Sequence, residues 1–161
     1  MSNPRIELLL DSLSRAFEGK SWHGPTLRGT LRGVGLKQAA ERPGKARNSV
    51  RDLVYHCAYW KYIARGWLNE AAGKDRGPKF PRSPANFPDR KEKLTEKQWA
   101  ADKRLLNAEH KRLIEAVEAL PPAKLDKRGA KGAPTYQELI LGVAAHDLYH
   151  AGQISLLKRL K

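Results

Sequence analysis

The stretch AHDLYHAGQI, residues 145–154, contains two histidines, His146 and His150, that are four positions apart. Residues four apart lie on the same side of an α-helix, about one turn from each other. Leu139 and Val143 fall on that same side when the helical spacing is continued towards the N-terminus. The stretch therefore predicts a helix whose core-facing side carries two imidazoles.

Three further segments place apolar residues at the spacing of one helix face. They span residues 4–17, 48–72 and 95–120, while the segment quoted above begins near residue 136 and runs to near the C-terminus. The third segment has a seven-residue repeat, formed by Trp99, Leu106, Leu113 and Leu120. No segment alternates apolar and polar residues as a half-buried strand does. The sequence therefore predicts an all-α protein, and four long amphipathic helices favour a four-helix bundle.

Turn-forming residues separate these helices. Residues 77–89 contain four prolines, at positions 78, 81, 84 and 88, which exclude regular structure and predict a long crossover connection. Pro25 can open a short helix over residues 25–31, and residues 32–45 should be irregular apart from one or two turns around 36–42. Thr95 with Gln98, and Thr135 with Glu138, have the spacing of capping boxes at helix starts.

Length and composition set the class of protein. A chain of 161 residues with 40% hydrophobic residues suits one domain, spanning residues 1–161, with a sizeable core. The longest apolar runs are far shorter than the roughly 20 residues of a membrane span. Arg5, Glu7 and Asp11 make the N-terminus unlike a signal peptide, so we expect a cytoplasmic protein. Cys57 is the only cysteine, which excludes an internal disulfide and favours a small buried apolar role for it.

The formal net charge of +14 is large for this length. A charge of this size can mark a nucleic-acid partner, but the lysines and arginines are spread along the chain, without the interleaved aromatic residues of a base-stacking surface. A solvated basic surface explains the pattern more simply. Attraction of an anionic small substrate is a milder functional alternative.

A third histidine, His56, replaces an apolar residue in the second segment. We expect one buried stripe there, made of Leu53, His56, Trp60, Ala64, Trp67 and Leu68. Each buried polar group without a partner costs about 1–3 kcal/mol, so three imidazoles in one core are costly unless something accepts their lone pairs. A divalent transition metal ion does so, and three protein ligands leave a coordination position open. The alternative is that each histidine is a core residue with ordinary hydrogen-bond partners.

Other polar and aromatic residues are candidates for supporting roles. Gln153 lies three residues after His150, where its amide can bond a ligand imidazole or a metal-bound water, or simply pack between helices. Trp60 is a candidate for the pocket wall. Asp52, one turn before His56, can orient its ring or be a solvated carboxylate near the helix start. His110 can offer a fourth imidazole or lie at the edge of the bundle.

The segments 145–154 (AHDLYHAGQI), 53–60 (LVYHCAYW) and 22–27 (WHGPTL) together resemble the DinB/YfiT-like metalloprotein superfamily. The resemblance covers nearly the whole chain in the same order. It implies a four-helix bundle of up-down-down-up topology, with a zinc or nickel site whose ligands are His56, His146 and His150. It also implies relatives that often form homodimers. Characterised relatives include thiol-dependent S-transferases and a maleylpyruvate isomerase that use low-molecular-weight thiols, although no motif in this chain identifies a thiol.

Three functional hypotheses follow. The first is a metal-dependent enzyme with a small-molecule substrate, in which the ion activates a thiol for transfer to an electrophile or a water for hydrolysis. The second is a non-catalytic metal-binding module of a stress response, in which the ion mainly joins two helices. The third is a nucleic-acid-binding protein, which rests on the net charge alone.

Overall fold

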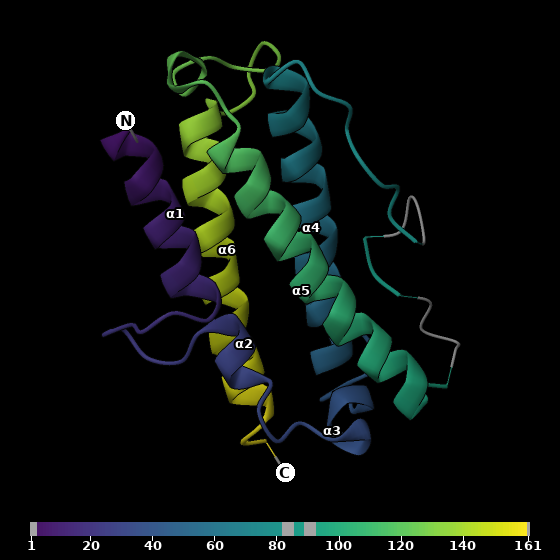
Figure 1. Ribbon diagram of the computed structural model, residues 1–161. Helices are drawn as coiled ribbons and strands as arrows, with labels where there is room; N and C mark the ends of the chain where they lie inside the picture. The colour runs from purple at the N-terminus through teal and green to yellow at the C-terminus, as the bar shows by residue number, and fades with distance from the viewer. Residues whose placement is uncertain (1–2, 82–85, 89–92, 161) are drawn as a thin grey trace.

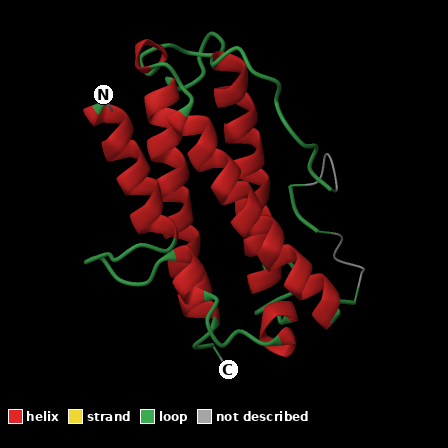
Figure 2. Cartoon of the chain, viewed as in Figure 1, coloured by secondary structure: helices red, strands yellow, loops and turns green. Residues whose placement is uncertain are grey.

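The computed structural model describes residues 3–81, 86–88 and 93–160, and these residues fold as helices joined by loops (Figures 1 and 2). The helices are α1 Pro4–Phe17, α2 Leu27–Thr30, α3 Leu36–Ala40, α4 Val50–Ala71, α5 Glu96–Glu118, the 3-10 turn η1 Pro122–Lys124 and α6 Tyr136–Leu157. The described residues contain no β-strand, so the all-α prediction is confirmed. Pro84 and Asp89 of the predicted connection lie outside the described residues. None of the described helices is long and apolar enough to cross a membrane.

Helix starts follow local capping chemistry. The boxes predicted at Thr95 and Thr135 are present, with the side chains of Gln98 and Glu138 bonded back to the cap residues. The short helix α2 begins two residues later than predicted, because the Thr26 side chain accepts a hydrogen bond from the Gly29 N–H and caps it. Residues 36–40 form α3, which is the short helical turn expected in that region.

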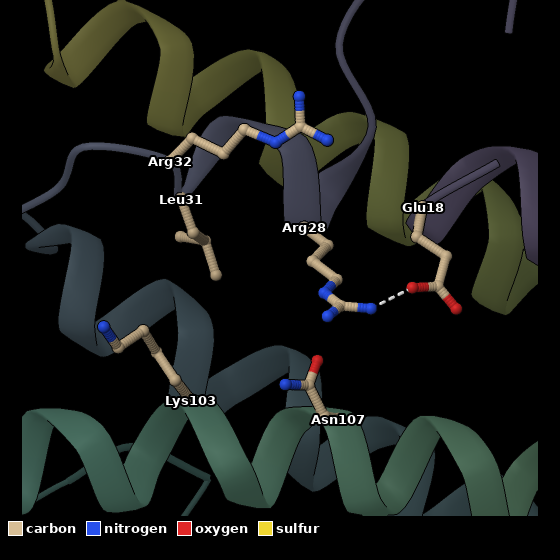
Figure 3. Close-up of a pocket in the computed structure, with 6 residues that line it drawn as sticks. All are labelled: Glu18, Arg28, Leu31, Arg32, Lys103 and Asn107. Carbon is tan, nitrogen blue, oxygen red and sulfur yellow. Dashed lines mark hydrogen bonds and ion pairs between the residues drawn. The ribbon is translucent and has the colours of Figure 1, made fainter. Parts of the chain in front are cut away.

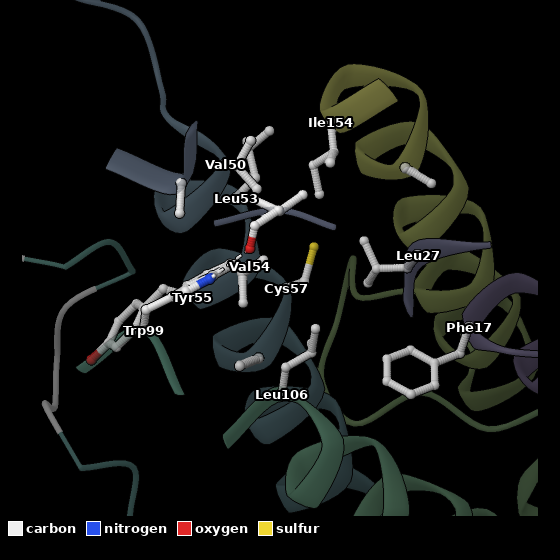
Figure 4. Packing of buried hydrophobic residues seen from close by; sticks show 14 of the residues in the cluster. Phe17, Leu27, Val50, Leu53, Val54, Tyr55, Cys57, Trp99, Leu106 and Ile154 are labelled. Atoms are coloured by element: carbon white, nitrogen blue, oxygen red, sulfur yellow. Dashed lines mark hydrogen bonds between the residues drawn. The ribbon is translucent and has the colours of Figure 1, made fainter. Parts of the chain in front are cut away.

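The long helices pack into a helical bundle (Figure 1). Helix α4 packs against α5 and α6, and α1 packs against α6 and α5. Two apolar clusters fill the space between them, one where α4 and α5 meet the short helices and one among α1, α5 and α6. Figure 4 shows the first cluster, in which the Cys57 side chain lies among apolar neighbours. This agrees with the small buried apolar role expected for the single cysteine. The seven-residue repeat of α5 is buried along its whole length.

The buried stripe predicted on α4 is wrong in part. Trp60 and Trp67 are 38% and 39% exposed, whereas Leu53, Ala64 and Leu68 are buried as expected. The inner face is instead shared with two charged residues, Lys61 and Arg65, which are fully buried. These cations can be buried because each has a carboxylate partner on a facing helix, a pairing that apolar periodicity does not reveal.

Three buried ion pairs tie α4 to its neighbours. Arg51 pairs with Asp102 at 2.8 Å and Arg65 with Glu109 at 2.7 Å, and both of these acids lie on α5. Lys61 pairs with Asp147 of α6, and neither side chain has any exposed surface. The pairs fix the position of α4 relative to α5 and α6, because a buried charge is tolerated only where its oppositely charged partner is within bonding distance.

Candidate metal centre

Three imidazoles from two helices converge at one point. His56 comes from the second turn of α4, and His146 and His150 come from successive turns of α6. The Nε2 atom of His146 lies 3.1 Å from Nε2 of His56 and 3.0 Å from Nε2 of His150. The structure therefore brings the three predicted histidines together, each presenting the same ring nitrogen to the shared centre.

Two amide side chains determine which nitrogen of the outer rings carries the proton. Nδ1 of His56 lies 2.6 Å from Oδ1 of Asn86, and Nδ1 of His150 lies 2.7 Å from Oε1 of Gln153. An amide oxygen only accepts hydrogen bonds, so in both pairs the imidazole donates its Nδ1 proton. Assigned in this way, Nε2 of both rings carries a lone pair and no proton.

Aromatic side chains border the His56 ring on two sides. Phe87 stacks on it with the ring centroids 4.7 Å apart and the ring planes 6° from parallel. Trp60 meets it edge-on at 6.3 Å, while keeping 38% of its own surface exposed. Tyr149 stands edge-on to His150 at 4.9 Å. These rings lie against the His56 and His150 sides of the cluster, and Trp60, the candidate for a pocket wall, is in contact with His56.

Burial keeps all three imidazoles neutral at physiological pH. It lowers the pKa of His56 and of His150 below the ordinary value of 6.5, although the hydrogen bonds to Asn86 and Gln153 partly oppose this. The pKa of His146 falls to about 3, first through burial and then through the two neighbouring imidazoles and the Lys61 cation. A proton therefore competes weakly for the inner lone pairs.

The cluster fits a divalent transition metal ion. Two imidazole nitrogens held about 2.0–2.1 Å from such an ion, at angles of about 95–110°, are about 3.0–3.4 Å apart. The two Nε2 separations of 3.0 and 3.1 Å lie in that range. Without an ion, neutral rings protonated at Nδ1 direct lone pairs at one another, which is unfavourable. Neutral imidazole suits zinc, nickel, copper and iron alike, so the donor set fits this class of ions.

Next to His146 in the chain, Asp147 belongs to a buried polar pair that apolar periodicity does not predict. Asp147 pairs with Lys61, and its Oδ1 atom has no hydrogen-bond partner among the described residues. Burial raises the pKa of Asp147, and it also raises that of the neighbouring Cys57 thiol well above the usual value. Cys57, His146 and Asp147 form a second group within ligand distance of one another. However, the Lys61 ammonium occupies the carboxylate, so the three-imidazole cluster is the better cation site.

Asp52 has a different role from either one considered for it. Its carboxylate accepts hydrogen bonds from the Ser49 N–H at 2.9 Å and from the Arg42 guanidinium at 2.9 and 3.0 Å. It is fully buried, so it is neither a solvated carboxylate nor the partner of a ring. Ser49 followed by Asp52 is a capping box at the start of α4, and this spacing is visible in the sequence.

The remaining histidines lie away from the cluster. His110 is buried against Phe17, with the ring centroids 3.8 Å apart, and does not lie beside the other three. His23 lies in an exposed turn. Asn86 and Phe87, which border the cluster, come from the proline-rich connection and have no periodic signal that could have marked them. Lys61 could have been noticed as a cation at a core-facing position of α4.

The matches to known proteins agree with this arrangement. The sequence profile of the DinB superfamily matches residues 21–154, a range that includes all three histidines. No curated protein and no solved structure matches the chain. A profile match over most of the chain, together with the helical bundle and its histidine cluster, leads to one conclusion. The chain belongs to the DinB superfamily.

Proposed function

We propose that the protein binds one divalent transition metal ion through Nε2 of His56, His146 and His150. The observation that carries this proposal is the convergence of the three Nε2 atoms, with Asn86 and Gln153 holding the protons on the opposite nitrogens. Ligand histidines commonly donate their other N–H to such an oxygen, which fixes the ring and the tautomer. Zinc and nickel are the ions we propose, since both accept imidazole readily.

We also propose a single domain with up-down-down-up topology. The directions of α4 and α5 support this, because both helices run towards the same end of the bundle (Figure 1). Helices α1 and α6 run in the opposite direction in the same view. In this arrangement the His56 ring comes from α4, and the His146 and His150 rings come from α6, a neighbouring helix that runs in the opposite direction.

The reaction we propose is metal-dependent transfer of a low-molecular-weight thiol to an electrophile, with hydrolysis as the second reaction type. The ion, when bound, lowers the pKa of a thiol or water at its open position and so supplies a nucleophile at neutral pH. The chain's own residues keep the three lone pairs free of protons and fix the rings. Phe87 and Trp60 limit the approach of solvent from the His56 side.

Metal analysis of the purified protein tests the site. We expect about one zinc or nickel ion per chain in the wild type, and loss of bound ion in His146→Ala. Gln153→Ala removes only the acceptor of the His150 proton, so it should weaken affinity by about 10–100-fold without abolishing binding. His23→Ala, an exposed histidine outside the cluster, is the matched control. Metal content that is unchanged in His146→Ala would contradict the proposal.

A non-catalytic role is the second candidate. The observation that favours it is that the ligands come from two helices, so an ion would join α4 to α6 as well as offering an open position. In that case removing the ion should unfold the protein rather than only inactivate it. Comparison of the metal-free and metal-loaded proteins therefore separates the two roles.

A further inference from the structure

A positively charged hollow lies between the α1–α2 region and α5, on residues that take no part in the histidine cluster. It measures about 460 Å³, a size typical of small-molecule pockets. We call it the basic hollow; its lining residues are Glu18, Arg28, Leu31, Arg32, Lys103 and Asn107. Figure 3 shows the Leu31 and Arg28 side chains extending from the α2 side towards Lys103 and Asn107 on α5.

The lining favours an anion. Three cations and one carboxylate give the basic hollow a net charge of +2. The carboxylate, Glu18, is bonded to Arg28, so its charge is already compensated (Figure 3). Arg32 and Lys103 have no ion-pair partner in the part of the chain that the structure describes. Two lining cations without a carboxylate partner, together with the Asn107 amide, are suited to a carboxylate or phosphate group, although the Lys103 ammonium also lies over the Trp99 ring, 5.1 Å from its centroid.

A second hollow of about 460 Å³ continues from the first along α1 and α5. The two share Glu18, Arg28 and Asn107, so together they form one groove. We call the second part the apolar hollow, because Leu10, Phe17 and Ile114 line it. Its charged lining residues are two cations, Arg28 and Lys111, and two carboxylates, Glu18 and Glu118, so this part has no net attraction for an anionic group. The groove is thus cationic in one part and, without net charge, partly apolar in the other.

His110 lies at the apolar hollow and lacks a full set of partners. The ring is 5% exposed, and its Nδ1 atom is buried without a hydrogen-bond partner among the described residues. Burial, with the nearby Lys61 and Arg28 cations, lowers its pKa to about 3, so the ring is neutral at pH 7. Because nothing accepts a proton from Nδ1, the ring's proton is favoured on Nε2, which leaves a hydrogen-bond donor for a group in the groove.

We propose that this groove binds a small amphiphilic organic anion, with its carboxylate or phosphate head beside Arg32 and Lys103 and its apolar part beside Ile114. The opposite orientation would place the head in the part of the groove whose lining charges balance. The site is separate from the histidine cluster and does not require a bound ion. A duplex nucleic acid fits less well, since the cations line a hollow of small-molecule size rather than an open ridge.

Displacement of the fluorescent anion anilinonaphthalene sulfonate from the purified protein tests the proposal. Octanoate and octyl phosphate, which carry both a head and an apolar chain, should displace the dye at low concentration. Octanol lacks the charge and inorganic phosphate lacks the chain, so each should be at least about tenfold less effective. Equal displacement by octanol, or by a short DNA duplex at physiological salt, would overturn the proposal.

Variants locate the binding site. Arg32→Glu with Lys103→Glu should weaken octanoate binding by about tenfold or more, because two attractions become repulsions. Arg104→Glu reverses one charge, half of the change made by the double variant, at an exposed neighbouring position of α5 outside the groove, and should change affinity less than about twofold. Asn107→Trp, at an exposed position shared by both hollows, should block them. His146→Ala should bind octanoate normally. If Asn107→Trp and the double variant bind octanoate like the wild type, the groove is not the site.

Discussion

Buried imidazoles occur in two different settings in this protein. Burial lowers the pKa of His146 and of His110 to about 3 in both settings. His146 meets two other Nε2 atoms near 3 Å, whereas His110 stacks on Phe17 and meets no other imidazole of the described residues. Convergence of nitrogens therefore distinguishes a candidate ligand from a packed core histidine, and a lowered pKa does not.

His110 should make folding stability depend on pH. In the unfolded chain its imidazole takes up a proton below about pH 6.5, whereas the folded protein resists this until about pH 3. The free energy of unfolding should therefore fall by about 1 kcal/mol for each unit by which the pH is lowered through that window. Above the window, the contribution of the neutral His110 ring to stability is fully present. Urea denaturation between pH 7 and pH 5 measures this loss.

His110→Phe is the comparison for this effect. A phenyl ring keeps a partner for Phe17 and cannot titrate, so the variant should lose less stability than the wild type on acidification. The other histidines are common to both proteins, and their contributions cancel in the difference. Parallel curves for the two proteins would show that His110 is not protonated on unfolding in the way described.

At the scale of single residues, the sequence predicted the three clustered histidines because helical spacing places them on core-facing sides. It could not predict Asn86, which borders His56 from a proline-rich segment without periodicity. Of the two roles open to Asp52, the position near the helix start agrees with the structure, but the side chain is buried as a cap rather than solvated. A carboxylate three residues after a serine is better explained as a helix cap.

At the scale of helices, prediction succeeded where apolar residues repeat and failed where charges are buried. The repeat from Trp99 to Leu120 located the inner face of α5 correctly. On α4, the apolar spacing predicts a buried Trp60. The inner positions are instead occupied by Lys61 and Arg65, each with its carboxylate partner on a facing helix. A cation in a core can be recognised only when the carboxylate on the facing helix is known, and that is tertiary information.

The Lys61–Asp147 pair should contribute strongly to the packing of α4 on α6. Lys61→Met leaves the Asp147 carboxylate buried without its counter-charge, which should lower the free energy of unfolding by about 3–5 kcal/mol. Urea denaturation at pH 7 measures the change. Adding Asp147→Val removes the stranded charge and should restore most of the lost stability.

The control for this prediction is Lys111→Met. Lys111 forms an ion pair with Glu115 along α5 at 4.0 Å, and its side chain is 81% exposed. Exposed pairs of this kind contribute about 0–1 kcal/mol, so the variant should be nearly as stable as the wild type. A loss in Lys61→Met no greater than that in Lys111→Met would mean that the buried pair does not fix the two helices.

At the scale of the whole molecule, a bound ion should stabilise the bundle because its ligands lie on separate helices. An ion at a free concentration about a thousand times its Kd adds about 4 kcal/mol, which raises the Tm by about 10 °C for a chain of this size. Thermal unfolding with and without a strong chelator should reveal this difference in the wild type and in His23→Ala. His146→Ala should melt at the same temperature in both conditions.

The metal-free protein separates the two proposed functions. If it keeps a cooperative transition at a lower temperature, the bundle folds without the ion and the ion is free to serve chemistry. If cooperative unfolding disappears, the ion is part of the fold, as the non-catalytic hypothesis requires. A Tm that does not respond to the chelator in any variant would contradict both hypotheses.

His56 and His146 are 90 residues apart in the chain, although their Nε2 atoms are 3.1 Å apart in space. During synthesis at about 5–20 residues per second, α4 is therefore made roughly 5–20 s before its partner histidines on α6 exist. A nascent chain carries one ligand through this interval and cannot enclose an ion. If the protein binds an ion as proposed, capture in the cell belongs to the stage after the last helix has joined the bundle.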